Sequence, residues 1–520
     1  MTRHFDVVVL GRSLGSLATA ALLARRDFRV LLLGQAQRPQ AYAFEQRVLC
    51  RRTFSMLFAS SPVFKRLLQE LAQTQRLRQR VRDLDPMFCF LGMGRRVQVP
   101  PDMQLFAREV EREFPEVRQL VEELYSTFAS VNAVADTIFE RDAVWPPGSF
   151  WERFETNRLA AALPLVSLEG SRELLGKFPP GHAFSRLVGL PAASASDLAL
   201  TSDELPPFAL ARLHGSWTRG VQELPGGEEE LVRFLVDRIK AHGGECLLNV
   251  RAREIVVQRG RAVGVRLEGE EESTGAGAIV CDLPGEALAE LAAGDGITQG
   301  AQRHWPRVAA RVGRFVVSIV VKEELIPEPL GHHAFILPVA ETAGSQRRPP
   351  IHLQVLNPRA LIANAGVAGE KLLVAEMLLL RNGPLTVLEA REAVLETLRE
   401  HLPFLDEHLV MVDSAHDGLP LYWYENGKKR LIDRVHVRGT APEAEPMLWQ
   451  WVVEPSGYLG LGGEPVRGPI PGTYLVGTTV LPGLGQEGQL LAAQSVARII
   501  THKDRSRQKL RRQMWTKIET

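Results

Sequence analysis

The chain contains 520 residues, of which 45% are hydrophobic and 24% are charged. These values are typical of a folded globular protein and exclude a disordered or collagen-like chain. Lys and Arg number 62 against 61 Asp and Glu, so the formal net charge is +1 and no global basic field favours nucleic acid as a partner. At about 150 residues per domain, the length predicts three or four domain-sized units.

The first 34 residues predict a βαβ unit. Asp6–Leu10 and Phe28–Leu33 have the continuous apolar pattern of buried strands. Between them lie the turn Gly11-Arg-Ser-Leu-Gly-Ser16 and a segment rich in Ala and Leu that predicts a helix. A strand, a glycine turn and a helix of this length are typical of a Rossmann dinucleotide-binding domain, in which phosphates sit on the helix N-terminus.

This turn departs from the G-x-G-x-x-G pattern of such domains. Ser13 and Ser16 stand where the second and third glycines normally let the pyrophosphate approach and the helix pack closely. Gly34 and Gln35 follow the second strand, where an acidic residue normally accepts hydrogen bonds from the ribose. Losing one charge-assisted hydrogen bond costs roughly 1.5 to 3 kcal/mol. The departures therefore predict weakened dinucleotide binding.

The middle of the chain predicts helices followed by a sheet. Residues 102–142 have the apolar spacing of helices, interrupted at Pro115. Residues 308–321, 351–356 and 371–380 read as strands, and so does Trp449-Gln-Trp451.

A second glycine-rich element lies near the C-terminus. Thr473–Gly477 predicts a strand and Gln489–Ile500 predicts a helix, with Pro482-Gly-Leu-Gly-Gln-Glu-Gly488 between them. Three glycines before a helix suit a backbone that approaches a ligand and offers N–H groups to it. An ordinary strand-turn-helix connection is the alternative interpretation.

The cysteines predict free thiols. The four residues are scattered, without a CxxC pair or the spacing of a zinc site, so we expect no metal site and no disulfide framework. No signal-peptide pattern precedes the first strand, and no apolar run reaches the roughly 20 residues needed to span a bilayer. We expect a cytoplasmic protein.

Together these segments resemble the phytoene desaturase family of FAD-dependent oxidoreductases, over nearly the whole chain. The most specific part is Tyr474-Leu-Val-Gly477 followed by Pro482-Gly-Leu-Gly485 and Gly488. Leu224-Pro-Gly-Gly227 and Gly331-His-His333 also follow the family's order.

The resemblance implies an α/β fold: a Rossmann-like FAD-binding domain of the GR2 flavoprotein type with an inserted α+β substrate or cap domain. The FAD-binding domain would be discontinuous, over residues 1–95, 205–300 and 455–505. Residues 96–204 and 301–454 would form the cap.

The resemblance also implies FAD as cofactor and a lipophilic isoprenoid or polyene as substrate. The residues expected at the cofactor are Gly11, Ser13, Leu14, Gly15, Ser16, Val250, Gly477, Gly483, Gly485, Gln486 and Gly488.

One part of the family pattern is missing. The glycine-rich pyrophosphate element that normally follows the ribose residue reads Gly34-Gln-Ala-Gln-Arg-Pro-Gln-Ala-Tyr42. Two hypotheses remain open. FAD binds through altered contacts, with Arg12 or Arg38 replacing the lost phosphate donors, or the chain is a non-catalytic relative that serves as a binding or assembly component. Under the first hypothesis, Ser13→Gly with Gly34→Glu should raise flavin occupancy.

No catalytic residue is assigned from the sequence. His332 and His333 are candidates near the expected flavin, but adjacent residues in a strand point to opposite faces, so only one could face a cavity. No HExxH helix or Walker lysine is visible, which argues against metalloprotease and NTPase functions.

The C-terminal segment predicts a surface contact. Residues 506–520 continue a basic amphipathic tail that begins at Thr501. Its apolar residues share one helical face, which suits an anionic membrane surface or a protein partner, with a frayed terminus as the alternative. The basic residues are Lys503, Arg505, Arg507, Lys509, Arg511, Arg512 and Lys517, and the apolar ones are Leu510, Met514, Trp515 and Ile518. A peripheral position at the membrane would follow from the first interpretation.

Overall fold

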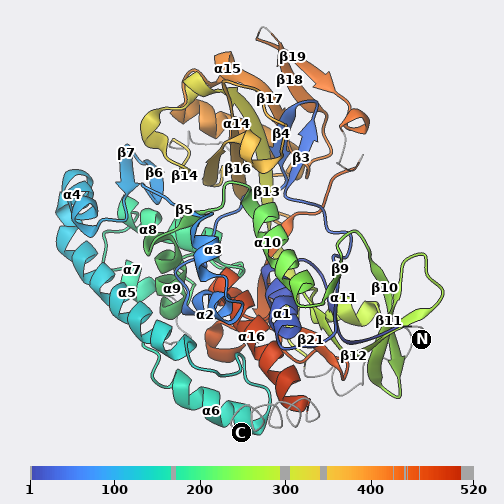
Figure 1. Ribbon diagram of the computed structural model, residues 1–520. Coiled ribbons are helices and arrows are strands. Elements are labelled where there is room, and N and C mark those ends of the chain that lie inside the picture. The colour runs from blue at the N-terminus through green and yellow to red at the C-terminus, as the bar shows by residue number, and fades with distance from the viewer. Residues whose placement is uncertain are drawn as a thin grey trace.

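The computed structural model describes residues 3–165, 171–292, 305–339, 348–425, 427–437, 441, 443–455 and 457–504. Two large sheets, two small two-stranded sheets and a group of helices make up this part of the chain (Figure 1). The basic tail expected at residues 506–520 lies outside it. Within the described residues, no helix is both long enough and apolar enough to cross a membrane.

The first sheet has seven strands in the order β10-β11-β12-β1-β2-β9, and β21 pairs with β12. The pairs among β1, β2, β9, β12 and β21 are parallel, which places the carboxyl ends of these strands at one edge. The strands are β1 (His4–Leu10), β2 (Val30–Leu33), β9 (Glu245–Leu247), β10 (Ala252–Gln258), β11 (Arg261–Leu267), β12 (Ser273–Cys281) and β21 (Thr473–Leu475).

Three helices pack together beside this sheet. Helix α1 (Leu14–Arg25) contacts both α10 (Gly227–Ala241) and α16 (Gly485–Lys503). The residues of α1 from Gly15 to Ala24 are all buried, because small and aliphatic side chains let the helix be enclosed on every side. The βαβ unit predicted from the first 34 residues is therefore present.

The second sheet has ten strands in the order β19-β18-β17-β13-β16-β15-β14-β6-β7, and β20 pairs with β13. It contains the strands expected from the middle of the chain. The strands are β6 (Phe88–Gly92), β7 (Arg95–Val99), β13 (Arg307–Lys322), β14 (His333–Ile336), β15 (Ile351–Leu356), β16 (Glu370–Leu380), β17 (Leu409–Asp413), β18 (Leu421–Glu425), β19 (Lys428–Ile432) and β20 (Leu448–Glu454).

A layer of helices lies at the lower left of Figure 1. As the apolar spacing predicts, Pro115 separates two of them. These helices are α4 (Met103–Glu113), α5 (Arg118–Phe139), α6 (Phe150–Ala160), α7 (Arg172–Leu175), α8 (Ala183–Ala195) and α9 (Pro207–Thr218). The remaining helices are α2 (Pro62–Glu70), α3 (Thr74–Arg78), α11 (Gly285–Glu290), α13 (Pro358–Leu361), α14 (Val387–His401) and α15 (Leu405–His408). β3 (Ala41–Phe44) and β4 (Arg47–Cys50) form a hairpin, and β5 (Arg82–Asp83) forms a long-range antiparallel pair with β8 (Gln222–Glu223).

The four cysteines are free thiols, as expected. Burial raises the pKa of Cys50 and of Cys89 to about 12, so neither is a reactive thiolate near neutral pH.

The strands of the first sheet come from three separate parts of the chain, and the domain boundaries expected from the sequence stay a prediction.

Candidate functional site

The candidate site begins at the N-terminus of α1, where β1 ends. Ser13 is the N-cap of this helix, and its Oγ accepts a hydrogen bond from the Ser16 N–H at 3.2 Å. The Ser13 N–H donates to Oδ2 of Asp282 at 3.0 Å. Asp282 directly follows β12, the parallel neighbour of β1, so both strands deliver their ends to this point. A carboxylate of the chain therefore lies where a Rossmann domain places its phosphates.

Gly11 makes room for this carboxylate. Its φ is +110°, and a Cβ at this position would fall 2.0 Å from the Asp282 carboxylate oxygens. The first glycine of the turn is thus needed for contact with the chain's own side chain.

Opposing influences act on the Asp282 carboxyl. Burial raises its pKa, while the N–H of Ser13 and the side chains of Ser13, Ser16 and Gln37 act to lower it. Among the described residues, Oδ1 is buried without a hydrogen-bond partner.

The Arg12 N–H donates to Oε1 of Gln37 at 3.3 Å. The N–H groups of residues 12, 13 and 16 therefore all point to oxygen atoms of the protein.

The arginines near the turn are paired with carboxylates. Arg12 is 6% exposed, and its Nη2 lies 2.5 Å from Oε1 of Glu229 in the first turn of α10. Nη1 of Arg38 lies 2.7 Å from Oε1 of Glu445. Both of the arginines expected to replace lost phosphate donors therefore already have an anionic partner within the chain.

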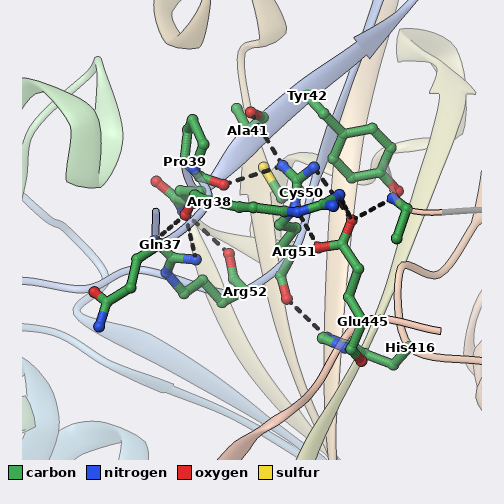
Figure 2. Close-up of polar contacts among 12 residues, drawn as sticks. Gln37, Arg38, Pro39, Ala41, Tyr42, Cys50, Arg51, Arg52, His416 and Glu445 are labelled. Carbon is green, nitrogen blue, oxygen red and sulfur yellow. Dashed lines mark hydrogen bonds and ion pairs between the residues drawn. The ribbon is translucent and has the colours of Figure 1, made fainter. Parts of the chain in front are cut away.

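Figure 2 shows how the loop after β2 is fastened. Nε of Arg51 donates to Oε2 of Glu445 at 2.7 Å, and its Nη1 donates to the Pro39 carbonyl at 3.0 Å. The His416 ring lies between two carbonyl oxygens, 3.0 Å from that of Arg51 and 3.1 Å from that of Glu445. The loop that carries the pyrophosphate element in the family is here joined to the β3–β4 hairpin through Glu445, which pairs with the exposed Arg38 of the loop and with the buried Arg51 after β4.

Side-chain and backbone groups of the chain also fill the part of the site where the ribose and adenine are expected. Oε1 of Gln35 accepts from the Ala252 N–H at 2.7 Å, and the Gln35 N–H donates to the Val250 carbonyl at 3.1 Å. Val250 thus lies in the turn between β9 and β10, in contact with the expected ribose position. A Cβ on Gly34 would lie 2.1 Å from the Leu248 carbonyl oxygen. A Glu at position 34 would therefore require this backbone to shift, and the expectation that Ser13→Gly with Gly34→Glu raises flavin occupancy stays a prediction.

The C-terminal glycines pack against backbone. A Cβ would lie 2.0 Å from the Asp282 carbonyl oxygen at Gly477, 2.9 Å from Leu461 Cα at Gly483 and 2.3 Å from the Leu481 carbonyl oxygen at Gly488. The glycines at these positions allow close contact with neighbouring backbone, which is typical of an ordinary strand-turn-helix connection.

The start of α16 is enclosed in the same way. Gly485 has φ of +51°, and a Cβ there would lie 2.1 Å from the Ala195 carbonyl oxygen. Oε1 of Gln486 accepts from the Leu57 N–H at 3.1 Å. Leu14 and Gly15 lie in the first turn of α1, and Gly15 approaches the Val476 carbonyl oxygen.

A small cavity lies under the N-terminus of α16. Its volume is about 10 Å³, the space of about one water, whereas ligand pockets usually measure roughly 300 to 1,000 Å³. Arg212 closes one side, with Nη2 2.5 Å from Oε1 of Glu487 and Nη1 2.7 Å from Oδ1 of Asp136. The lining residues are Leu57, Ser60, Ser61, Ala195, Arg212, Leu213, Ser216, Arg219, Leu484, Gln486 and Glu487.

These residues do not fit FAD in the arrangement described. The pyrophosphate position holds a carboxylate, the nearby arginines are neutralised, and the cavity at the expected flavin end admits about one water. No step of a flavin reaction is derived from them.

The histidine candidates form a buried cluster with His352. Nδ1 of His333 lies 3.1 Å from Nε2 of His352, and Nε2 of His333 lies 3.4 Å from Oγ of Ser55. The ring centroids of His332 and His333 lie 4.7 Å apart. Contrary to the expectation from the sequence, these side chains therefore do not point to opposite faces of a strand. The reason is that β14 begins at His333 and leaves His332 in the preceding turn.

Burial keeps these rings neutral. It lowers the pKa of His332 and of His352 to about 4, and neighbouring histidines or arginine add to the effect. Trp217 packs edge-on against the rings of His333 and His352 at 5.2 and 5.3 Å. The rings of Trp217, His333 and His352 are buried, and none of the contacts around them points to a catalytic role.

The sequence interpretation missed the acidic residues of the site. Asp282, Glu229 and Glu445 decide the charge around the turn, yet none belongs to a recognised motif. One signal was available: Asp282 follows a continuous apolar strand, and the carboxyl ends of parallel strands meet at one edge.

Comparison with known proteins gives the fold. No protein-family model matches the chain, and no curated protein matches it either. Solved structures do. An oxidoreductase from Methanosarcina mazei is 16% identical with a TM-score of 0.56, and the match covers 95% of this chain and 99% of that one.

Two amine oxidases are similar over the same extent. Putrescine oxidase, in a structure described as a redesign of cofactor binding, is 14% identical with a TM-score of 0.56, and the match covers 96% and 99% of the two chains. Cyclohexylamine oxidase from Brevibacterium oxydans is 14% identical with a TM-score of 0.52 and the same coverage. The expected α/β fold class is therefore confirmed: the chain shares its fold with this oxidoreductase and these two oxidases, and the likeness does not single out the phytoene desaturases.

Proposed function

We propose that the protein keeps the fold of FAD-dependent oxidoreductases but works without the cofactor, as a binding or assembly component. The observation that carries this proposal is the Asp282 carboxylate on the N-terminus of α1. A helix N-terminus favours one anion through its free N–H groups and its macrodipole. Here the chain supplies that anion itself.

Charge opposes entry of a pyrophosphate. Two like unit charges about 4 Å apart repel by roughly 1 kcal/mol in water and 4 kcal/mol at the effective dielectric of a protein surface. Moving Asp282 aside would also leave its Oδ2 without the Ser13 N–H, and an unmade buried hydrogen bond costs about 1 to 3 kcal/mol. Arg12 cannot offset these terms without releasing Glu229.

A second candidate is an FAD-dependent oxidoreductase, in its finer form one of the phytoene desaturase type acting on a lipophilic isoprenoid. The full-length likeness to oxidases favours it. It requires that Asp282 move away and that the loop shown in Figure 2 release its ion pairs.

Ligand-induced thermal stabilisation separates the two candidates. A ligand at 100 times its dissociation constant stabilises the folded state by about 2.7 kcal/mol, which raises the melting temperature measurably. We expect neither FAD nor ADP to stabilise the wild type. Asp282→Ala should gain stabilisation by ADP, because the Ser13 N–H becomes free and the charge is lost. Asp282→Asn should gain less, because it loses the charge but keeps the side-chain volume and an oxygen that accepts from the Ser13 N–H.

Two outcomes would speak against the proposal. Stabilisation of the wild type by FAD would favour the oxidoreductase. Absence of any ADP effect on Asp282→Ala would mean that the pyrophosphate position is not at the N-terminus of α1.

A further inference from the structure

Helix α6 exposes three large aromatic side chains. Phe150 is 74% exposed, Trp151 76% and Phe154 65%. Positions 150, 151 and 154 share one face of the helix, and the Phe150 and Trp151 rings lie 5.5 Å apart, edge to face. Single exposed apolar residues are ordinary, but a contiguous group marks an interaction surface.

The acidic residues of α6 are used on other sides of the helix. Glu152 forms a capping box with Ser149 and an ion pair with Arg467 at 2.5 Å. Glu155 lies 3.1 Å from Nη2 of Arg498 on α16. The carboxylates therefore carry little free charge, and they fasten the helix to the body of the protein.

The arginines of α6 remain available. Arg153 and Arg158 are exposed, and within the described part of the chain neither forms an ion pair. Arg158 lies four residues after Phe154 and therefore on the same side of the helix. The outward face combines Trp, Phe and Arg, with aromatic rings beside positive charge.

More positive charge follows in the sequence. Arg498, which contacts α6, lies five residues before the end of α16 at Lys503, roughly 7.5 Å along the helix axis. From Lys503 to the C-terminus the sequence carries seven basic residues against Asp504 and Glu519. The basic part of the sequence therefore follows α16, the helix that Arg498 joins to α6.

We infer that the aromatic face of α6 is a docking surface for an anionic lipid membrane. Aromatic side chains are favoured at the boundary between headgroups and acyl chains, and Lys and Arg are attracted to anionic headgroups. The face projects from the molecule on a helix whose opposite side is held by ion pairs, which suits insertion into a soft surface. This inference does not depend on whether FAD binds.

The test is co-sedimentation of the full chain with vesicles. We expect the protein to sediment with vesicles of phosphatidylglycerol and phosphatidylcholine, but weakly with phosphatidylcholine alone, and to be released by salt. Trp151→Ser with Phe154→Ser should lower the partition coefficient at least about tenfold, because both substitutions remove apolar area that insertion would bury.

A matched control exists in Phe404, which is 61% exposed beside Asp406 and Glu407. Phe404→Ser should leave vesicle binding unchanged. Because the substituted side chains are exposed, unchanged melting temperatures will show that all variants are folded.

Three outcomes would overturn the inference. The first is equal binding to neutral and anionic vesicles. The second is full vesicle binding by the double variant, which would assign any binding to the tail alone. The third is self-association or capture of a protein through Trp151 with no vesicle binding, which would identify the surface as a protein interface.

Discussion

At the scale of single residues, Asp282 occupies the position where the sequence predicts a dinucleotide phosphate. Its carboxylate accepts from the Ser13 N–H and fills the space over Gly11. Ser13 departs from the glycine motif, but it has a structural role as the N-cap of α1. The turn is therefore completed by the protein's own groups.

The raised pKa of Asp282 has a consequence for stability. A carboxyl whose pKa is higher in the folded than in the unfolded state binds more protons when folded, so it lowers stability as pH rises above its ordinary value near 4. Asn does not titrate. Asp282→Asn should therefore gain unfolding free energy relative to wild type as pH is raised from about 4 toward neutrality, measured by urea denaturation at each pH. A pH-independent difference would contradict the assignment.

At the scale of elements, the buried Arg212 on α9 joins three helices. It contacts Glu487 on α16 and both Asn132 and Asp136 on α5. Removing one partner of a buried pair typically costs about 3 to 5 kcal/mol, because the remaining charge stays buried without compensation.

This contact predicts the effect of a single substitution. Arg212→Met should lower the unfolding free energy by about 3 to 5 kcal/mol, and adding Glu487→Gln should recover part of the loss because it removes the unpaired charge. Urea denaturation of the single and double variants measures both effects. If the losses of unfolding free energy in the two single variants simply add in the double variant, Arg212 and Glu487 do not interact.

His332, just before β14, and His352, within β15, predict an acid-sensitive core. Their pKa values of about 4 lie below the ordinary value near 6.5, so the unfolded state binds more protons between these limits. The contribution of these histidines to the unfolding free energy is fully present above about pH 6.5. It is lost as pH decreases toward 4, by roughly 3 kcal/mol for each residue. His352→Gln should lose less stability than wild type over this range, measured by urea denaturation. The same pH slope in both proteins would be inconsistent with a buried neutral His352.

At the scale of the whole molecule, the sequence was sufficient for the fold and insufficient for the site. The βαβ unit, the C-terminal strand-turn-helix element and the second sheet are predictable because each depends on local apolar patterns. The contacts that close the site are not local. Ser13 meets Asp282 across 269 positions and Arg51 meets Glu445 across 394, so only the folded chain reveals which charges are paired.

We propose that the chain's own side chains occupy the position expected for a dinucleotide. The most direct test is the visible absorption spectrum of gently purified protein, before and after incubation with FAD and removal of the excess, followed by denaturation to release any bound flavin. We predict a colourless protein that retains no FAD in either sample. Flavin bands corresponding to about one FAD per chain would contradict the account and would restore the oxidoreductase as the function to be tested.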